Sequence, residues 1–311
     1  MKVFRGWLAA VGLTILTPLS GTAQTIVAEA PGSSFENIAL GPDNALYVTD
    51  GINARILRYS AKDGLSTYAQ LDVSPIGIIS DSDGTMYFSA QLRIPGGSGP
   101  PCITQGKLIY RAAKGAPPQL YLRAMDAIFL NGWTPLAPGQ LLIADSWKGI
   151  IWELDTKAGK LSKFIVDPLL DMPRGAPLRI VPPPAAKGIK VHGGYVYISN
   201  VAGRMIVRAK LDGQGRPGPI EVVHENVQVN DFEFSPNGTL YFTSRDDKVF
   251  RVIGGKIEEF VSGSPAILGN KSLIWAADGS GPYVTTDGGR GTTGCDPPLG
   301  PARIVRFDSK D

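Results

Sequence analysis

The segments ALGPDNALYVTD (39–50) and FSPNGTLYFTS (234–244) share one pattern, in which a turn rich in Gly, Asn and Pro precedes an apolar strand. The pattern occurs six times in the chain. The other copies are IISDSDGTMYFSA (78–90), PLAPGQLLIADS (135–146), KVHGGYVYISN (190–200) and AADGSGPYVTT (276–286). Self-similarity at a regular spacing indicates a repeat architecture.

Equivalent positions of the six copies are 40 to 55 residues apart, and a second strand follows each copy, as in RILRY (55–59) and KVFRV (248–252). A unit of this length with about four short strands is typical of a β-propeller blade. No amphipathic helix long enough to serve as a crossover separates the copies. We therefore predict an all-β fold, a six-bladed β-propeller. The equivalent positions are Tyr47, Tyr87, Leu142, Tyr197, Tyr241 and Tyr283.

The two ends of the repeat region predict how the ring closes. TIVAEA (25–30) precedes the first copy and RIVRFD (303–308) follows the last, so we expect one strand to complete the other's sheet. A β-sandwich, or a pair of them, is the alternative, because it also has evenly spaced strands. Six aligned copies are not expected of a sandwich. The proline-rich stretch 177–188 is interpreted as a loop between blades three and four.

Composition narrows the class of protein. Of 311 residues, 43% are hydrophobic and 19% are charged, which excludes a disordered chain. The 38 Gly and 25 Pro residues favour strands and turns over long helices, so an all-α bundle is excluded. The formal charge is only +3, and no run of Lys and Arg occurs after the N-terminal segment. Nucleic acid is therefore not an expected partner.

The first residues predict a leader. Residues 1–23 have a basic start, an apolar stretch and a small-residue exit at Gly21 and Ala23, which is typical of a secretory signal peptide. An uncleaved anchor helix is the alternative, but Pro18 interrupts an apolar span that is short for a bilayer. We expect one domain over 24–311, secreted or periplasmic, monomeric and free of the membrane once the signal is removed.

Export would place the two cysteines, Cys102 and Cys295, in an oxidising compartment. The loops that carry them, 93–106 and 288–302, occupy the same position within blades two and six. We therefore predict a Cys102–Cys295 disulfide. Two free thiols are the alternative.

Candidate functional residues come from the start of each inner strand, because these positions converge from all blades on the central channel. Most of the blades contribute an amide, a carboxylate or an ammonium group there. The residues are Glu36, Ile76, Asn131, Lys187, Asn230 with its neighbour Asp231, and Ser272.

The segments FENIALGPDNALYVTD, FLNGWTPLAPGQLLIADS, KGIKVHGGYVYISN and VNDFEFSPNGTLYFTS resemble the gluconolactonase and regucalcin-like superfamily of six-bladed propellers, over about residues 30–308. The resemblance implies a small-molecule substrate and a divalent cation (calcium, magnesium or zinc) in the channel. It implies cation ligands at Glu36, Asn230 and Asp231, and substrate binding by Asn131 together with Glu36 and Asn230.

One position departs from that superfamily, which has Pro-Asn-Gly-Ile where this chain has Ala186, Lys187, Gly188 and Ile189. A protonated lysine has three donors and no lone pair for a cation. At ~4 Å, two unit positive charges repel by about 4 kcal/mol at an effective dielectric constant of about 20. We therefore expect Lys187 to replace the cation and to pair with Glu36 and Asp231. A merely structural ion pair is the alternative.

These residues favour hydrolysis of a lactone or an ester. In this hypothesis Asp231 activates a water molecule, while Lys187 and Asn131 hold the carbonyl oxygen of the substrate. Two alternatives remain open. The channel could shape a reactive substrate for cyclisation without hydrolysis, as certain propellers of biosynthesis do, or the protein could bind a ligand or another protein without turnover.

Overall fold

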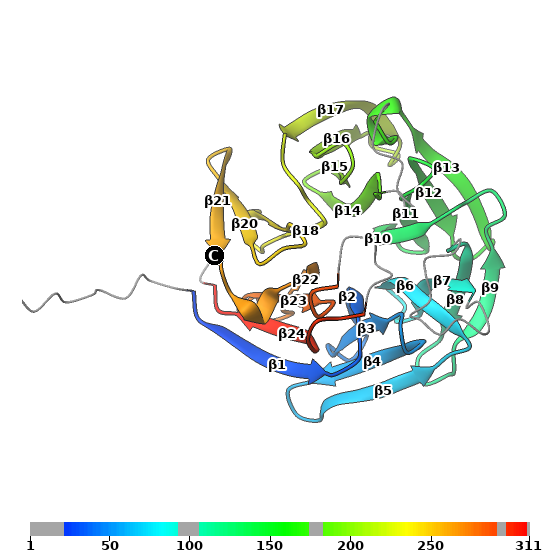
Figure 1. Cartoon of the computed structure of the whole chain (residues 1–311). Coiled ribbons are helices and arrows are strands. Elements are labelled where there is room, and N and C mark those ends of the chain that lie inside the picture. Colours follow the sequence, from blue (N-terminus) through cyan, green and yellow to red (C-terminus); the bar gives the residue numbers. More distant parts are fainter. Residues whose placement is uncertain (1–21, 93–105, 174–182, 291–296, 310–311) are drawn as a thin grey trace, which may run out of the picture.

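The structure is a computed structural model that describes residues 22–92, 106–173, 183–290 and 297–309. These residues form six four-stranded antiparallel sheets arranged around a central axis (Figure 1). The six-bladed β-propeller predicted from the repeats is therefore confirmed. In the described residues, no helix is long and apolar enough to span a bilayer, and the helical segments are two 3₁₀ turns, Pro168–Leu170 and Pro265–Ile267.

Blades one to five are simple meanders in which the first strand of each lies nearest the axis (Figure 1). Blade one is β2 (Phe35–Leu40), β3 (Leu46–Asp50), β4 (Arg55–Ser60) and β5 (Gly64–Gln70). Blade two is β6 (Val73–Ser80), β7 (Met86–Leu92), β8 (Leu108–Ala112) and β9 (Gln119–Arg123). Blade three is β10 (Leu130–Ala137), β11 (Gln140–Asp145), β12 (Ile150–Asp155) and β13 (Lys160–Val166). Blade four is β14 (Ala186–His192), β15 (Tyr195–Asn200), β16 (Met205–Leu211) and β17 (Pro217–Glu225). Blade five is β18 (Asp231–Phe234), β19 (Leu240–Thr243), β20 (Val249–Ile253) and β21 (Lys256–Val261).

Blade six closes the ring with both ends of the chain. It contains β22 (Asn270–Trp275), β23 (Pro282–Thr286) and β24 (Ala302–Phe307), and its outer strand is β1 (Gln24–Ala30). β1 pairs antiparallel with β24, from Gln24 opposite Phe307 to Ala30 opposite Ala302. The expected pairing of the terminal strands is confirmed. It covers the outer edge of β24, which would otherwise expose unpaired backbone groups.

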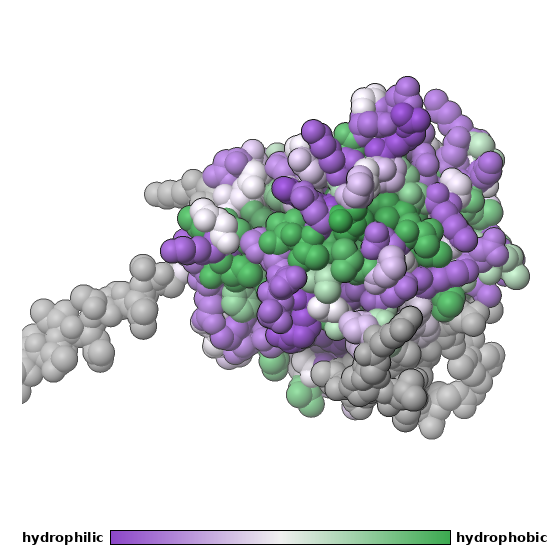
Figure 2. All heavy atoms as spheres, turned by 90° about the horizontal axis from the view of Figure 1, so that it is seen from above, coloured by the Kyte–Doolittle hydropathy of each residue, from purple (hydrophilic) through white to green (hydrophobic). Residues whose placement is uncertain are grey.

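The apolar core lies between neighbouring blades. Along each second strand, residues two apart share a face, and one face carries fully buried residues such as Val48, Ile198 and Phe242. Figure 2 shows the rim of the disc, with an apolar band across the middle of this face and hydrophilic residues above and below it. Burial of both faces of each sheet supplies the main stabilisation of the ring.

A β-bulge near the start of the inner strand determines which side chains reach the axis. The register shifts between Phe35 and Ile38 in β2, and the inner strands of blades two, three, four and six shift at the equivalent place. Two residues of the bulged strand then oppose one residue of its partner. A hydroxyl on the second strand stabilises the bulge, as where the backbone N–H of Gly188 donates to Ser199 Oγ at 2.8 Å.

Two glycines at these bulges let neighbouring inner strands approach closely. A Cβ added to Gly77 would lie 1.8 Å from the carbonyl oxygen of Asn131, and one added to Gly132 would lie 2.1 Å from that of Lys187. No other residue fits such a contact without moving a backbone. The blades therefore present equivalent residues side by side around the channel.

Candidate active site

Five buried or half-buried polar residues meet at the end of the channel where the inner strands begin. The Nζ of Lys187 lies 2.9 Å from Glu36 Oε1 and donates to Asn230 Oδ1 at 2.8 Å. The Nζ of Lys271 lies 2.9 Å from Glu36 Oε2 and 3.1 Å from Asp287 Oδ2. We call this group, formed by Glu36, Lys187, Asn230, Lys271 and Asp287, the axial network.

The fold holds each member of the axial network in place. Glu36, Lys187 and Lys271 occupy the same position in the bulges of β2, β14 and β22. Asp287 directly follows β23, and its Oδ1 accepts the backbone N–H groups of Gly289 and Arg290, each at 3.0 Å, which leaves Oδ2 for Lys271. The side-chain amide of Asn230 also donates to the carbonyl oxygen of Lys271 at 2.5 Å.

Burial and neighbouring charges shift the titration of the axial network. Burial alone would raise the pKa of Glu36, but the ammonium groups of Lys187 and Lys271 outweigh it and hold that pKa far below its ordinary value. The pKa of Lys187 is lowered, chiefly by burial and further by the charge of Lys271, although Glu36 opposes the shift. Lys187 and Lys271 are each 5% exposed, whereas the Glu36 side chain is 24% exposed. The carboxylate is therefore the part of the network nearest to solvent.

The residues predicted to act together lie in separate groups of contacts. Lys187, Glu36 and Asn230 are in direct contact, as the predicted replacement of a cation requires. Asp231, by contrast, accepts a hydrogen bond from Ser272 Oγ and lines a cavity with Lys190, farther along the channel. Asn131 is buried, and its Oδ1 accepts from Asn37 Nδ2 at 3.2 Å. Asp231 and Lys187, two described residues, form no hydrogen bond or ion pair with each other.

Lys271 and Asp287 were missed by the sequence reasoning. The repeats predict Ser272 as the blade-six counterpart of Lys187, but the bulge of β22 makes Lys271 the equivalent residue, one position earlier. The signal was present, because blades four and six both have lysine, a small residue and then an aliphatic one (Lys-Gly-Ile and Lys-Ser-Leu). Asp287 lies directly after β23, whereas Asp50 and Asp145 are the last residues of β3 and β11, and all three accept backbone N–H groups in the next turn.

The axial network does not fit a divalent cation. Such a cation needs several oxygen ligands, yet both oxygens of Glu36 and the Oδ1 of Asn230 already bind ammonium groups. The third ligand expected from the resemblance, Asp231, belongs to a different group of contacts. No group of three or more His, Cys, Asp or Glu side chains suited to a metal ion occurs among the residues that the structure describes.

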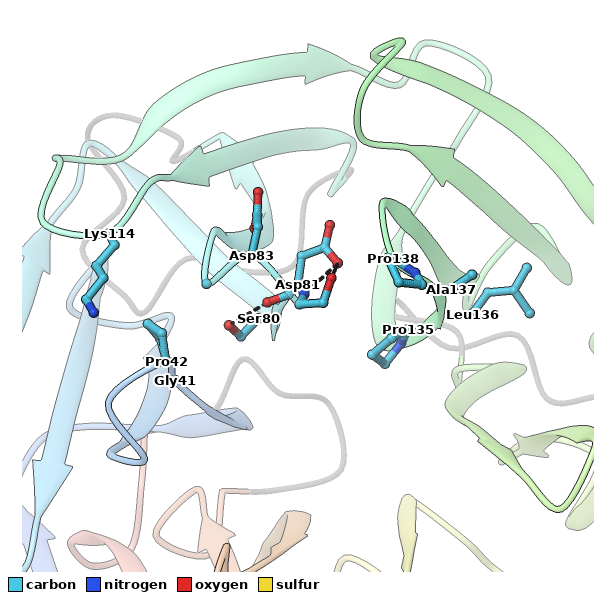
Figure 3. Close-up of a pocket in the computed structure, with 12 residues that line it drawn as sticks. Gly41, Pro42, Ser80, Asp81, Asp83, Lys114, Pro135, Leu136, Ala137 and Pro138 are labelled. Carbon is cyan, nitrogen blue, oxygen red and sulfur yellow. Dashed lines mark hydrogen bonds between the residues drawn. The ribbon is translucent and has the colours of Figure 1, made fainter.

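A hollow of about 580 Å³ lies outside the channel, between the turns that follow the inner strands of blades one to three (Figure 3). Its acidic side chains already have partners. Asp81 accepts hydrogen bonds from Ser82, from the backbone N–H of Gly139 and from Thr156 Oγ1, and Asp83 accepts the N–H of Thr85. These contacts hold turns together and join two blades. This hollow is therefore a structural junction between blades rather than a candidate active site.

Two further predictions fall outside the described residues. Cys102 and Cys295, the predicted disulfide, lie in 93–105 and 291–296, and most of the predicted signal peptide lies in 1–21. Both stay predictions.

Comparison with known proteins identifies the fold. No protein-family model matches the chain, and no curated protein matches its sequence. Solved structures do match: a luciferin-regenerating enzyme has a TM-score of 0.68 at 12% identity, with 93% of this chain and 96% of that chain covered. A gluconolactonase from Xanthomonas campestris has a TM-score of 0.67 at 11% identity, covering 93% and 91%. The calcium-binding protein regucalcin from Agrobacterium tumefaciens has a TM-score of 0.64 at 13% identity, covering 93% and 96%.

The fold is that of the gluconolactonase and regucalcin-like six-bladed propellers. This confirms the resemblance inferred from the repeats at the level of the fold. In this six-bladed propeller, the start of the inner strands carries an ammonium pair rather than a set of oxygen ligands.

Proposed function

We propose that this propeller is a hydrolase that opens a small lactone or ester without a metal ion, at the axial network. The observation that carries the proposal is that two buried ammonium groups bind the two oxygens of one partly exposed carboxylate, Glu36. Fixed positive charge at the end of a channel can stabilise the negative charge that develops on a carbonyl oxygen. The gluconolactonase among the structures of this fold supports the reaction class.

Lys271 supplies the positive charge in this proposal. Lys271 Nζ forms ion pairs with Glu36 Oε2 and Asp287 Oδ2, but Asp287 Oδ2 accepts no hydrogen bond among the described residues. An ammonium group has three N–H donors, so Lys271 keeps a donor for the carbonyl oxygen of the substrate. Asn131 is proposed as a second donor, because its Oδ1 accepts the amide of Asn37 while its own Nδ2 has no partner among the described residues.

Lys187 is proposed as the general base, in place of Asp231. Its neutral amine has two N–H groups, which match its two acceptors, Glu36 Oε1 and Asn230 Oδ1, and one lone pair for a proton. Because the pKa of Lys187 is lowered by burial and by Lys271, the neutral form is accessible at a lower pH than for an ordinary lysine. Glu36 is a poor base, because its pKa is also lowered.

The proposed reaction then balances. A water molecule attacks the carbonyl carbon as its proton passes to Lys187 Nζ, and the oxyanion forms against the N–H of Lys271. Collapse of this intermediate breaks the bond to the alkoxide oxygen, which takes the proton back from Lys187. The products are a carboxylic acid and an alcohol, joined in one molecule when the substrate is a lactone. We further propose that the protein is exported through 1–23 and acts as a monomer on a small molecule.

The test is turnover of a panel of lactones and aryl esters in ¹⁸O-labelled water, with the products analysed by mass spectrometry. We expect one ¹⁸O atom in the acid product, and a loss of kcat of about 10²-fold or more in Lys187→Met. Lys163→Met, at an exposed position of β13, is the control and should keep parental activity. Undiminished turnover in Lys187→Met would overturn the role of Lys187. A product without ¹⁸O would overturn hydrolysis.

A further inference from the structure

A second candidate site lies in the channel next to the axial network, along the middle of the inner strands. There a cavity of about 250 Å³, which we call the channel cavity, is lined by residues of all six inner strands. At about 30 Å³ per water molecule, it has room for about eight waters or a small organic molecule. Its lining includes Asn37, Ile79, Thr134, Lys190, Glu233 and Ile274.

An ion pair lies on the wall of the channel cavity. Lys190 Nζ lies 2.9 Å from Glu233 Oε2, with 17% and 19% of the two side chains exposed. Burial would lower the pKa of Lys190, but Glu233 and Asp231 outweigh it and raise that pKa. Lys190 therefore stays charged and neutralises one of the two carboxylates.

The second carboxylate lacks such a partner. Asp231 is 7% exposed, and its Oδ2 accepts a hydrogen bond from Ser272 Oγ. Its Oδ1 has no hydrogen-bond partner among the described residues. Glu233, by comparison, also accepts the backbone N–H of Phe234 on its Oε1 at 3.0 Å. With one lysine and two carboxylates, the channel cavity has a formal charge of −1 near neutral pH.

A buried negative charge is costly unless a cation or several donors compensate it. The other groups that line the channel cavity indicate which ligand could compensate this charge. Lys190 uses one of its three N–H donors for Glu233, so two are left for an oxygen acceptor. The lining also includes the aliphatic side chains of Ile79, Ile189 and Ile274.

We propose that the channel cavity binds a small aliphatic ammonium compound that carries a hydroxyl group. The ammonium group binds Asp231 Oδ1, the short carbon chain packs on the isoleucines, and the hydroxyl oxygen accepts from Lys190. This site uses none of the residues of the axial network. Its test is therefore independent of the proposed hydrolysis.

The experiment is isothermal titration calorimetry of the intact protein with 5-aminopentan-1-ol at low ionic strength. The neutral 1,5-pentanediol and the anionic 5-hydroxypentanoate have the same chain length and are the comparison ligands. We expect the amine to bind at least tenfold more tightly than either. Equal binding of amine and diol, or no binding of the amine, would overturn the proposal.

Two variants with opposite expected effects locate the site. Asp231→Asn removes the charge with little change of shape and should weaken amine binding at least tenfold. Lys190→Met leaves the channel cavity more negative and should strengthen amine binding, although the hydroxyl loses its donor. Urea unfolding of each variant verifies the fold. If Asp231→Asn does not fold, the comparison of amine and diol on the parent protein still tests the proposal, because equal binding of the two would contradict it.

Discussion

Lys187 and Lys271 come from blades four and six, and their ammonium groups bind opposite oxygens of the same carboxylate, each at 2.9 Å. Asp287 provides a second negative charge, so two lysines and two carboxylates balance formally. The fold thus keeps two like charges close together in a buried place. Such an arrangement makes the protonation of Lys187 depend on the charge of Lys271.

Lys271→Met tests this dependence. Removing the second ammonium group removes one cause of the lowered pKa of Lys187, so the acid limb of the rate against pH should move to higher pH. The loss of an oxyanion donor should also lower kcat about 10²-fold. Initial rates between pH 6 and 10 measure both effects. Lys271→Arg keeps the charge and should leave the limb nearly in place, and an unmoved limb in Lys271→Met would contradict the coupling.

Glu36→Gln tests the stability of the axial network. It leaves two buried ammonium groups without their common partner, and we expect the free energy of unfolding to fall by about 3 kcal/mol at neutral pH. Urea denaturation followed by fluorescence gives this value. Glu225→Gln, an exposed change in β17, is the matched control. Equal stability of the two variants would mean that the network contributes little.

The stability of the parent protein should also depend on acid in a predictable direction. The pKa of Glu36 is lower in the folded protein than its ordinary value of 4.5, so its contribution is fully present above about pH 4.5. That contribution is lost as the pH falls from there towards the folded pKa. Urea midpoints between pH 3 and 7 should therefore decline more steeply below pH 4.5 in the parent than in Glu36→Gln. Parallel curves would argue against the ion pairs.

Divalent cations should not stabilise the protein. An ion present at 100 times its Kd would add about 2.7 kcal/mol, and a change of that size moves Tm by several degrees in a domain of this size. We expect Tm to be the same in EDTA and in millimolar calcium, magnesium or zinc. Lys187→Asn, which puts an amide in place of the ammonium group, is the comparison variant. A higher Tm of the parent protein in calcium, together with a stoichiometric ion in elemental analysis, would refute the conclusion that the axial network does not fit a divalent cation.

Gly132→Ala tests the close approach of blades three and four. The new Cβ would lie 2.1 Å from the carbonyl oxygen of Lys187, so a strand must move, and we expect a loss of about 3 kcal/mol in unfolding free energy. Gly213→Ala is the control, because no atom lies within 4 Å of its added Cβ and its φ is not positive. Similar urea midpoints for both variants would contradict the close contact.

The repeat positions could be aligned from the sequence because each is local. A turn followed by a tyrosine-containing strand is specified within about a dozen residues, and the structure pairs these tyrosines with equivalent inner-strand residues, as Tyr47 with Ala39 and Tyr241 with Glu233. The bulges of the inner strands could not be predicted from such local patterns. A bulge adds one unpaired residue, and this single step separates Lys271 from Ser272.

The order of residues alone was enough for the number of blades, the pairing of the terminal strands and the candidate lysine at position 187. These follow from turn residues, apolar alternation and chemical type, which are properties of short segments. The partners of that lysine needed the closed ring. Glu36 and Lys271 are far apart in the chain, and they meet because the first and sixth blades are neighbours once β1 pairs with β24.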